Sequence, residues 1–520
     1  MNGAQSLVHA FVDGGVDVCF TNPGTSEMHF VAALDQIAGM RCVLGLFEGV
    51  VTGAADGYYR MTDRPAATLL HLGPGLANGL ANLHNAKKAQ SGVVNIVGDH
   101  ALTHMALDAP LTSDIAGLAA PMSHWVRSAS SSDTVAEDGR AAIVQARARP
   151  GQIATLILPA DTAWTQRQKP WLAQGPVMEA PAAARPDAAI EFASGILRAH
   201  GASTLLLLGG RALRAESTSW AGRIMAATGC AVMSEFYGAR IERGAGRVAV
   251  PRLPYAVDAA LAVLQRFTHI VLVGAREPVA FFAYPDKPGR LSPPGCQVWQ
   301  MTQPVDDQAG ALEALADSLG ARARPYSAVL PAPAAAGLAQ GSLTPDAIGL
   351  LLGALIPENA IVIDEAVSTG RRFDQATCNA APHDWLTNMG GSIGFGLPVA
   401  IGAAIGAPGR KVIALEGDGS AMYTPQALWT MARENLDITV LIFANHAYQI
   451  LRGEFAGVGA GPLGQRATDM LTLDRPCLDW LSIGRGMGVP CARVHDLSSL
   501  AAEMRRALAG EGPHLIEVMM

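Results

Sequence analysis

The most constraining feature of this chain is its repeated alternation of short β-branched runs with longer segments rich in alanine, leucine and glycine. Each run is followed by a turn and a helix-like stretch, as at Val16–Phe20, Ala67–Leu72, Val93–Val97 and Ile153–Leu158. Strands that alternate with helices build parallel sheets, because each crossover returns the chain to the same edge of the sheet. The sequence therefore predicts an α/β protein with doubly wound parallel sheets.

Two proline-rich stretches interrupt this alternation. Gln166–Asp187 and Arg322–Pro345 each contain four prolines and show little periodicity, which is typical of linkers. They divide the chain into three predicted domains, at residues 1–165, 188–322 and 343–520. A chain of 520 residues is long enough for this number, at about 150 residues per domain.

Composition excludes several classes of protein. Charged residues make up 16% and hydrophobic residues 50%, so the chain can bury a large core and favours an oligomer over a disordered monomer. No apolar run reaches the ~18 residues of a membrane span, and the first fifteen residues lack the basic segment of a signal peptide. The net charge of −7 gives no support for binding nucleic acid. Seven scattered cysteines without a C-x-x-C pair argue against zinc sites or disulfides and favour a cytoplasmic location.

The sharpest motif lies in the third predicted domain. An apolar strand, Lys411–Leu415, runs directly into Glu416–Ser420 (EGDGS), and a second apolar strand, Ile438–Phe443, leads to Asn445. One strand–helix–strand crossover separates Asp418 from Asn445. Such a crossover brings both strand ends to the same sheet edge, where ligands bind in α/β proteins.

The residue types at this edge suit a diphosphate held through a metal ion. Asp418 and the side-chain oxygen of Asn445 are hard ligands of the kind that Mg²⁺ or Ca²⁺ prefers. Gly417 and Gly419 let the backbone approach a phosphate closely, and the amides of Gly419 and Ser420 favour an anion. The alternative interpretation is an ordinary turn followed by a helix cap.

The run from Gly417 to Tyr448, GDGSAMYTPQALWTMARENLDITVLIFANHAY, resembles the thiamine-diphosphate signature of the acetolactate synthase, pyruvate decarboxylase and benzoylformate decarboxylase superfamily. That signature begins G-D-G and ends N-N, and Ala444 replaces its first asparagine. The resemblance implies pyrimidine-binding, middle and diphosphate-binding domains, with thiamine diphosphate as cofactor. It also implies that Asp418, Asn445 and the Ala447 carbonyl hold the metal.

Two neighbouring segments resemble further parts of the cofactor site. In Gly390–Pro398, the resemblance implies that Ile393 props the cofactor into its bent conformation and that the Gly391 carbonyl accepts from its 4′-amino group. In Glu365–Thr369, it implies that Ser368 donates to the diphosphate. A glycine-rich start of a helix and a helix-capping serine are the plainer interpretations.

The first predicted domain supplies a candidate acid. Val43–Phe47 leads into Glu48, and a carboxylate at the end of an apolar strand is costly unless it is paired or complements a helix N-terminus. Glu48–Arg60 (EGVVTGAADGYYR) resembles the superfamily's glutamate segment. The resemblance implies that Glu48 exchanges a proton with the aminopyrimidine ring of a cofactor bound by the neighbouring subunit. A homodimer is then the minimum assembly, and a homotetramer is favoured.

Two more candidates resemble benzoylformate decarboxylase in particular. His71–Asn78 matches the family's G-P-G-x-x-N turn, with His71 where the decarboxylase has a catalytic histidine, and Asn22–Glu27 resembles the decarboxylase's N-P-G-S-N-E segment. The resemblance implies catalytic roles for His71 and Thr25. The alternatives are a histidine bonded to backbone and a turn hydroxyl.

The segment Tyr448–Val458 resembles the part of the decarboxylase that lines its substrate pocket. Ile450, Leu451 and Phe455 would form an apolar wall, unless they serve ordinary helix packing. The decarboxylase's second catalytic histidine has no counterpart here, and the matching stretch offers Tyr284, whose role stays open.

These resemblances favour a magnesium-dependent, non-oxidative decarboxylase of a 2-oxo acid with an apolar or aromatic side chain, with carboligation as a side activity. An acetolactate-synthase-like carboligase that joins two 2-oxo acids is the second hypothesis. A homologue that binds the cofactor without turnover is the third, and the intact Glu48, Asp418 and Asn445 argue against it. FAD in the middle domain stays possible but unsupported, because Gly209-Gly210 is not a full G-x-G-x-x-G fingerprint.

Overall fold

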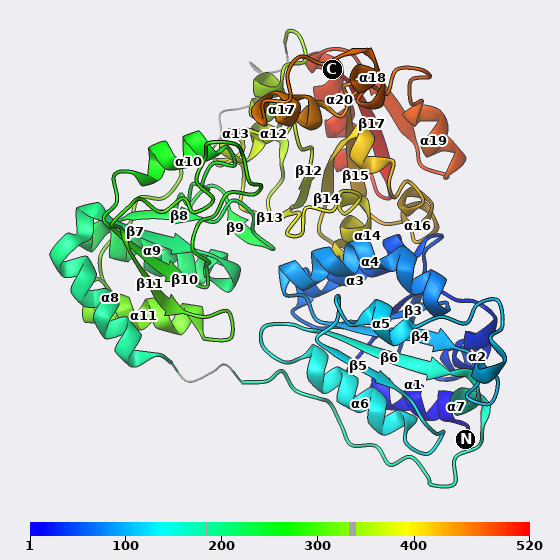
Figure 1. Ribbon diagram of the computed structural model, residues 1–520. Helices are drawn as coiled ribbons and strands as arrows, with labels where there is room; N and C mark the ends of the chain where they lie inside the picture. The colour runs from blue at the N-terminus through cyan, green and yellow to red at the C-terminus, as the bar shows by residue number, and fades with distance from the viewer. Residues whose placement is uncertain (182–184, 332–339) are drawn as a thin grey trace.

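In the computed structural model, which describes residues 1–181, 185–331 and 340–520, the chain forms three α/β units, each around its own sheet (Figure 1). Parallel strands alternate with helices in all three. The predicted fold class is therefore confirmed.

The first sheet has six parallel strands in the order β2-β1-β3-β4-β6-β5. Helices α3 and α4 cover one face, and α1 and α6 cover the other. The strands are β1 (Val18–Asn22), β2 (Arg41–Leu44), β3 (Ala66–Leu70), β4 (Val93–Asp99), β5 (Trp125–Ser128) and β6 (Ile153–Pro159), and the helices are α1 (Gly3–Asp13), α2 (Met28–Gln36), α3 (Glu48–Thr62), α4 (Leu72–Ala89), α5 (Ile115–Ala119) and α6 (Val135–Ala146).

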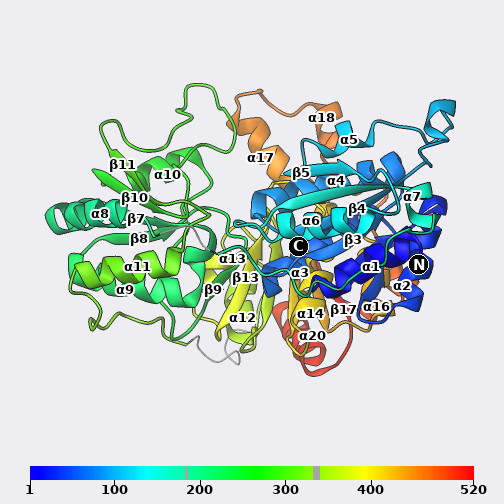
Figure 2. The same cartoon turned by 90° about the horizontal axis from the view of Figure 1, so that it is seen from below.

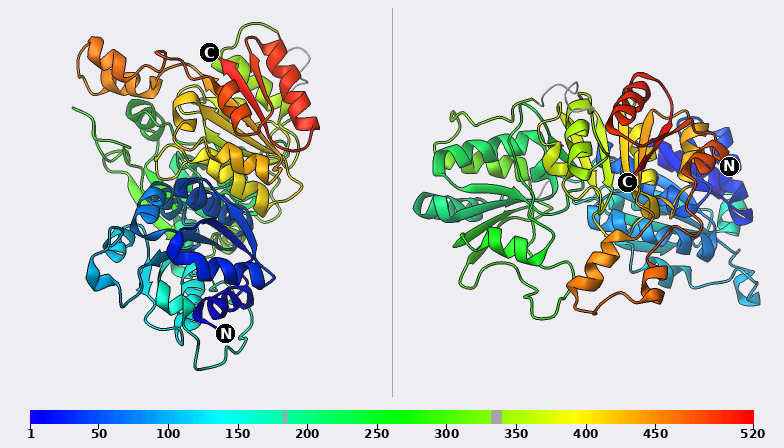
Figure 3. Two further views of the ribbon diagram at one scale, coloured as in Figure 1. Left: turned by 90° about the vertical axis from the view of Figure 1, so that its right-hand side faces the viewer. Right: turned by 90° about the horizontal axis from the view of Figure 1, so that it is seen from above.

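The second sheet has four parallel strands in the order β11-β10-β7-β8. These strands are β7 (Thr204–Leu208), β8 (Ala231–Ser234), β10 (His269–Val273) and β11 (Gln297–Thr302), packed by α8 (Asp187–His200), α9 (Ala215–Thr228), α10 (Val257–Leu264) and α11 (Gln308–Ser318). In the views from below (Figure 2) and from above (Figure 3, right), this unit stands beside the other two.

The third sheet has seven strands in the order β16-β17-β15-β14-β12-β13-β9. Its strands are β9 (Ile241–Arg243), β12 (Ile361–Glu365), β13 (His383–Thr387), β14 (Val412–Gly417), β15 (Ile438–Ala444), β16 (Cys491–Val494) and β17 (His514–Met519). Its helices are α12 (Pro345–Leu355), α13 (Phe373–Ala376), α14 (Gly396–Gly406), α15 (Asp418–Ala421), α16 (Ala427–Arg433), α17 (Gln449–Gly457), α18 (Gln465–Met470), α19 (Trp480–Gly486) and α20 (Leu497–Ala509). Strand β9 comes from the middle of the chain and pairs antiparallel with β13, which ties the second unit to the third.

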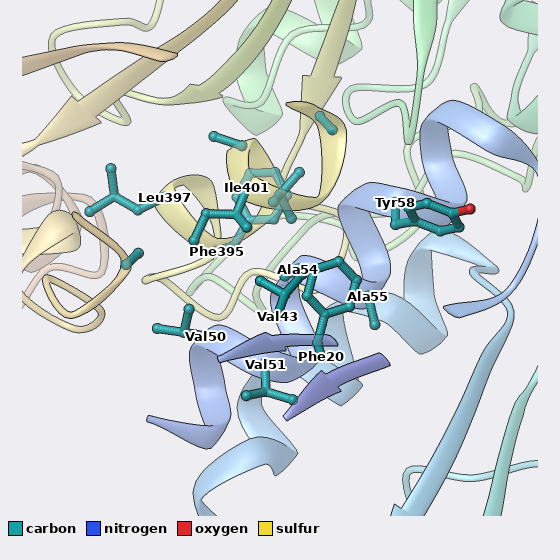
Figure 4. Packing of buried hydrophobic residues seen from close by; sticks show 14 of the residues in the cluster. Phe20, Val43, Val50, Val51, Ala54, Ala55, Tyr58, Phe395, Leu397 and Ile401 are labelled. Atoms are coloured by element: carbon teal, nitrogen blue, oxygen red, sulfur yellow. The ribbon is translucent and has the colours of Figure 1, made fainter. Parts of the chain in front are cut away.

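Helices α3 and α14 join the first and third units at close range. A Cβ atom at Gly402 would lie 1.8 Å from the Ala54 carbonyl oxygen, and one at Gly57 would lie 2.1 Å from that of Val399. Glycine is therefore needed for the two backbones to approach. Around this contact, apolar side chains of both units form one continuous core (Figure 4).

The described residues of the predicted linkers contain no helix or strand apart from Asp187 and Pro345, their last residues, which begin α8 and α12. The first linker follows α7 (Ala160–Trp164), and residues 182–184 and 332–339 of the two linkers lie outside the described residues. Within the described ranges, no helix is both long and apolar enough to cross a membrane.

Candidate active site

Asp418 and Asn445 lie at the ends of two adjacent parallel strands. Strands β14 and β15 pair in register up to Gly417 and Phe443, so the residues that follow them meet at one edge of the sheet. The backbone N–H of His446 donates to Asp418 Oδ2 at 2.7 Å and links the two strand ends. The structure thus brings the two predicted metal ligands together.

Asp418 is a buried carboxylate without a strong cationic partner. It is 1% exposed and accepts from the backbone N–H groups of Gly419 and His446, while the His446 ring nitrogen Nδ1 lies 3.9 Å away. Burial raises the pKa of Asp418, because the backbone hydrogen bonds from His446 and Gly419 only partly compensate its charged form. A bound divalent cation would complete this compensation, so this residue fits the predicted role.

The other predicted metal ligands also offer oxygen atoms. Asn445 Oδ1 accepts one hydrogen bond, from the Ala447 N–H at 3.0 Å, and the Ala447 carbonyl accepts none from the described residues. No cluster of three or more His, Cys, Asp or Glu side chains that suits a metal occurs in the part of the chain that the structure describes. The set expected here is of another kind, with one carboxylate, one amide and one backbone carbonyl.

The predicted anion-binding turn is tightly packed. The Ser420 hydroxyl lies 3.1 Å from both the N–H and the carbonyl of Gly417, and the Gly419 N–H donates to Asp418 Oδ1. A Cβ atom at Gly419 would lie 2.6 Å from the Tyr448 ring, which explains glycine at that position. Ser368, the predicted diphosphate donor, lies on the loop after the neighbouring strand β12 and lines a cavity described below.

Beneath the predicted cofactor loop lies a buried carboxyl pair that sequence reasoning missed. Glu365 accepts from the N–H groups of Gly394, Phe395 and Gly396 at 3.2, 3.3 and 2.9 Å, and Glu416 is the register partner of Glu365 on the neighbouring strand. Burial raises the pKa of Glu365 to about 7 and holds that of Glu416 well above its usual range. The pair therefore retains a proton near neutral pH.

Two asparagines of α4 clamp the same loop from the other side. Asn85 Nδ2 donates to the Ser392 carbonyl at 2.8 Å, and Asn82 Nδ2 donates to the carbonyls of Gly49 and Gly394 at 2.8 and 3.2 Å. Gly391 and Gly394 adopt positive φ angles of 78° and 88°, which glycine tolerates. Gly391 is exposed and Ile393 half-buried, so both remain accessible for the roles predicted for them.

Glu48 begins α3 and is half-buried in the single chain. Its Oε2 accepts from Asn78 Nδ2 at 3.0 Å. A Cβ atom at Gly75 would lie 3.2 Å from Glu48 Oε1 and 3.4 Å from the His71 Cβ, so the two predicted catalytic residues face the same turn at the start of α4.

His71 is held by a carboxylate that sequence reasoning did not single out. Its Nδ1 lies 2.8 Å from Oε2 of Glu27, whose side chain is fully buried, and Glu27 also accepts from the Gly24 N–H and the Ser26 hydroxyl. Glu27 ends the Asn22–Glu27 motif, which was the available signal. Thr25 is exposed beside this pair, and its role stays a prediction.

A cavity of about 430 Å³ lies between the second unit, the loop after β12 and helix α17. Of the predicted pocket residues, Ile450 lines it, whereas Leu451 and Phe455 do not. The part of its wall that α17 contributes is formed by Gln449, Ile450, Gly453, Glu454 and Gly457. Tyr284 also lines the cavity, and its hydroxyl donates to Glu454 Oε2 at 2.8 Å.

Comparison with known proteins agrees with this arrangement. The family model described as "Thiamine pyrophosphate enzyme, N-terminal TPP binding domain" matches residues 1–117, and the corresponding C-terminal TPP binding domain matches residues 369–518. The chain is 50% identical to the Mycobacterium tuberculosis protein named "Putative acetolactate synthase large subunit IlvX", over 100% of this chain and 99% of that protein. It is 31% identical to benzoylformate decarboxylase of Pseudomonas aeruginosa, over 97% and 96% of the two chains.

Among solved structures, the thiamine diphosphate-dependent 4-hydroxybenzoylformate decarboxylase of Rhodococcus jostii RHA1 superposes with a TM-score of 0.86 at 25% identity. The alignment covers 100% of this chain and 99% of that one. The match therefore includes all three sheets.

Proposed function

Because the chain belongs to the thiamine pyrophosphate enzyme family, we propose that it is a magnesium-dependent, non-oxidative decarboxylase of 2-oxo acids with aromatic or apolar side chains. One observation carries the proposal: a buried Asp418 without a strong cationic partner lies beside Asn445 at the sheet edge. This is where a metal-bound diphosphate would be held.

The residues of the chain would divide the work as follows. Asp418, Asn445 and the Ala447 carbonyl would hold Mg²⁺, and Gly391 and Ile393 would position the pyrimidine ring. Bound thiamine diphosphate supplies a carbon nucleophile and an electron sink for the bond that breaks when CO₂ leaves.

Glu48 and His71 would move protons. Glu48 would exchange one with the pyrimidine ring, and Asn78 would hold its carboxylate in place. His71 would assist proton transfer at the substrate, with Glu27 fixing the orientation of its ring through Nδ1. Thr25, exposed beside this pair, would contact the substrate.

A screen for CO₂ release tests the proposal. The purified protein, supplied with thiamine diphosphate and Mg²⁺, is assayed against a panel of aromatic and aliphatic 2-oxo acids, and the aldehyde products are identified. We expect turnover of at least one aromatic substrate, and Glu48→Gln should lose most of it while keeping its cofactor affinity within about tenfold. Full activity of Glu48→Gln would contradict the assignment of the acid.

The second candidate is an acetolactate-synthase-like carboligase, favoured by the 50% identity to the M. tuberculosis protein. Pyruvate separates the two reactions, because a decarboxylase releases acetaldehyde and a synthase forms acetolactate. Absence of CO₂ release from every 2-oxo acid would instead favour a homologue that binds the cofactor without turnover. The visible absorption spectrum of the purified protein tests for FAD in the second unit.

A further inference from the structure

The cavity beside α17 adjoins the residues predicted to hold the cofactor. It is lined by Ser368 from the loop after β12 and by Ile450 from α17. On its other side the segment that carries Tyr284 also carries Phe281, and a Cβ atom at Gly391 would lie 3.1 Å from the Phe281 ring. This segment of the second unit therefore reaches from the predicted cofactor loop to α17, which makes the cavity the natural place for the substrate.

Helix α17 turns a polar face toward this cavity. Residues at positions 450, 453, 454 and 457 share one side of a helix of 3.6 residues per turn. That side presents one aliphatic side chain, two glycines and the Glu454 carboxylate. The apolar wall expected from Leu451 and Phe455 is not on this face.

The carboxylate of Glu454 can accept further hydrogen bonds. Tyr284 donates to its Oε2, but its Oε1 accepts no hydrogen bond and the carboxylate forms no ion pair within the described residues. Burial and the bond to Glu454 raise the pKa of Tyr284, so its hydroxyl stays protonated and continues to donate. A carboxylate can accept about four hydrogen bonds in all.

The positive groups in the cavity do not neutralise Glu454. Lys287 lines the cavity, but it forms an ion pair at 2.6 Å with Asp258, which does not line it. Arg371 also lines the cavity; it is exposed and forms no ion pair in the described ranges. A molecule that fills the space would thus meet Glu454 and Tyr284 at one wall.

We propose that Glu454, oriented by Tyr284, narrows the substrate class given above: among aromatic and aliphatic 2-oxo acids it favours those whose side chain ends in a hydrogen-bond donor over those whose side chain is purely hydrocarbon. The donor is either a neutral hydroxyl or a cationic group. The inference rests on the proposed decarboxylase function. A site built to bind a donor rejects the analogue that lacks it, because that analogue covers Oε1 of the carboxylate and gives it no hydrogen-bond partner.

Three substrates test the selection: benzoylformate, 4-hydroxybenzoylformate and 5-guanidino-2-oxopentanoate. We expect kcat/KM of the holoenzyme to be at least about tenfold higher for one of the donor-bearing acids than for benzoylformate. Glu454→Leu should abolish this preference while benzoylformate is still turned over. Glu454→Gln should keep the preference if the donor is a hydroxyl and lose it if the donor is cationic. Ala456→Leu, which adds the same side chain outside the lining face, should leave the preference intact.

An unchanged preference in Glu454→Leu would overturn the inference and leave the decarboxylase function standing. If the wild type turned over no 2-oxo acid, the proposed function would be wrong, and binding of 4-hydroxymandelate, mandelate and 2-hydroxy-5-guanidinopentanoate, measured by calorimetry, would still test the cavity. The inference is supported if a donor-bearing acid binds more tightly than mandelate and if Glu454→Leu abolishes this difference. Equal binding of all three acids contradicts it.

Discussion

Glu27 and His71 form a hydrogen-bonded pair in which the Glu27 side chain is buried and the His71 side chain is partly exposed, and the catalytic role proposed for His71 depends on this bond. The Glu27 carboxylate accepts hydrogen bonds from the Gly24 N–H and the Ser26 hydroxyl and a third from the His71 ring. A Cβ atom at Gly24 would lie 2.3 Å from the same ring. The ring is therefore fixed by both the carboxylate and the packing around it. An imidazole oriented in this way transfers protons more effectively than a mobile one.

Replacing Glu27 by Gln should lower kcat about ten- to a hundredfold, because the ring loses its charged partner, while cofactor affinity stays unchanged. In the His71→Ala background the same replacement should have little further effect, since the two residues act as one unit. Steady-state kinetics of the two single variants and the double variant measure this. Additive losses would show that Glu27 acts independently of His71.

Glu235 should make the stability of the fold depend on pH. It follows strand β8, its Oε1 accepts from the Arg276 N–H at 2.9 Å, and burial raises its pKa to about 7 from a usual 4.5. Between these two values the folded state binds more protons than the unfolded state. Stability therefore falls as the pH rises from 4.5 to 7 and then levels off.

Glu235→Gln should remove this contribution and stabilise the protein at pH 8 by about 1–2 kcal/mol. At pH 4.5 the variant and the wild type should be equally stable. Thermal unfolding of both proteins across this range provides the comparison, which isolates Glu235 from other titrating groups. A difference between them that does not change with pH would rule out the assignment.

At the scale of secondary structure, the contact between helices α3 and α14 leaves no room for a side chain at Gly402. Gly402→Ala should lower stability by about 2–3 kcal/mol, because the new methyl group meets the Ala54 carbonyl oxygen of a neighbouring backbone that cannot move aside. Gly195 on α8 is a matched control, since it is exposed with nothing within 4 Å of a Cβ atom. Gly195→Ala should raise stability by about 0.5–1 kcal/mol. The thermal unfolding midpoints of the two variants test both predictions. If the two substitutions changed the midpoint equally, the helices could separate to make room for the methyl group.

Buried central strands could be predicted from the sequence because their neighbours on both sides reinforce the local pattern. Ile153–Leu158 matches β6 to within one residue, whereas Val43–Phe47 does not match β2, which begins at Arg41 and ends at Leu44. Strand β2 lies at the edge of its sheet and pairs only with β1. The three residues of β9 are too few for any periodicity, and their place in the third sheet depends on pairing with a distant segment.

The candidate site likewise contains residues that the sequence could predict and residues that it could not. Asp418 and Asn445 could be found because one crossover sets their separation along the chain and in space. The Asn22–Glu27 motif contained Glu27, but its contact with His71 could not be predicted, since His71 is 44 positions away. The polar wall of the cavity depends on the phase of α17 and on its contact with Tyr284, neither of which a local pattern contains.

At the scale of the whole molecule, the candidate site draws on distant parts of one chain. Asn82 bridges the Gly49 carbonyl, next to Glu48, and the Gly394 carbonyl of the cofactor loop. The family resemblance nevertheless predicts that Glu48 serves the cofactor bound by a second subunit. These two arrangements give opposite results when inactive variants are combined.

Co-expression of Glu48→Gln with Asp418→Ala distinguishes them. Where each site combines Glu48 of one subunit with Asp418 of the other, a mixed dimer contains one site with both residues intact, so purified mixed dimers should show about half of wild-type activity. Where each site uses one chain only, every site keeps one defect and no activity returns. We expect restoration, measured as CO₂ release by doubly tagged dimers purified over two affinity columns. Each variant expressed alone is the control, and mixed dimers no more active than these would place Glu48 and Asp418 of one chain in the same site.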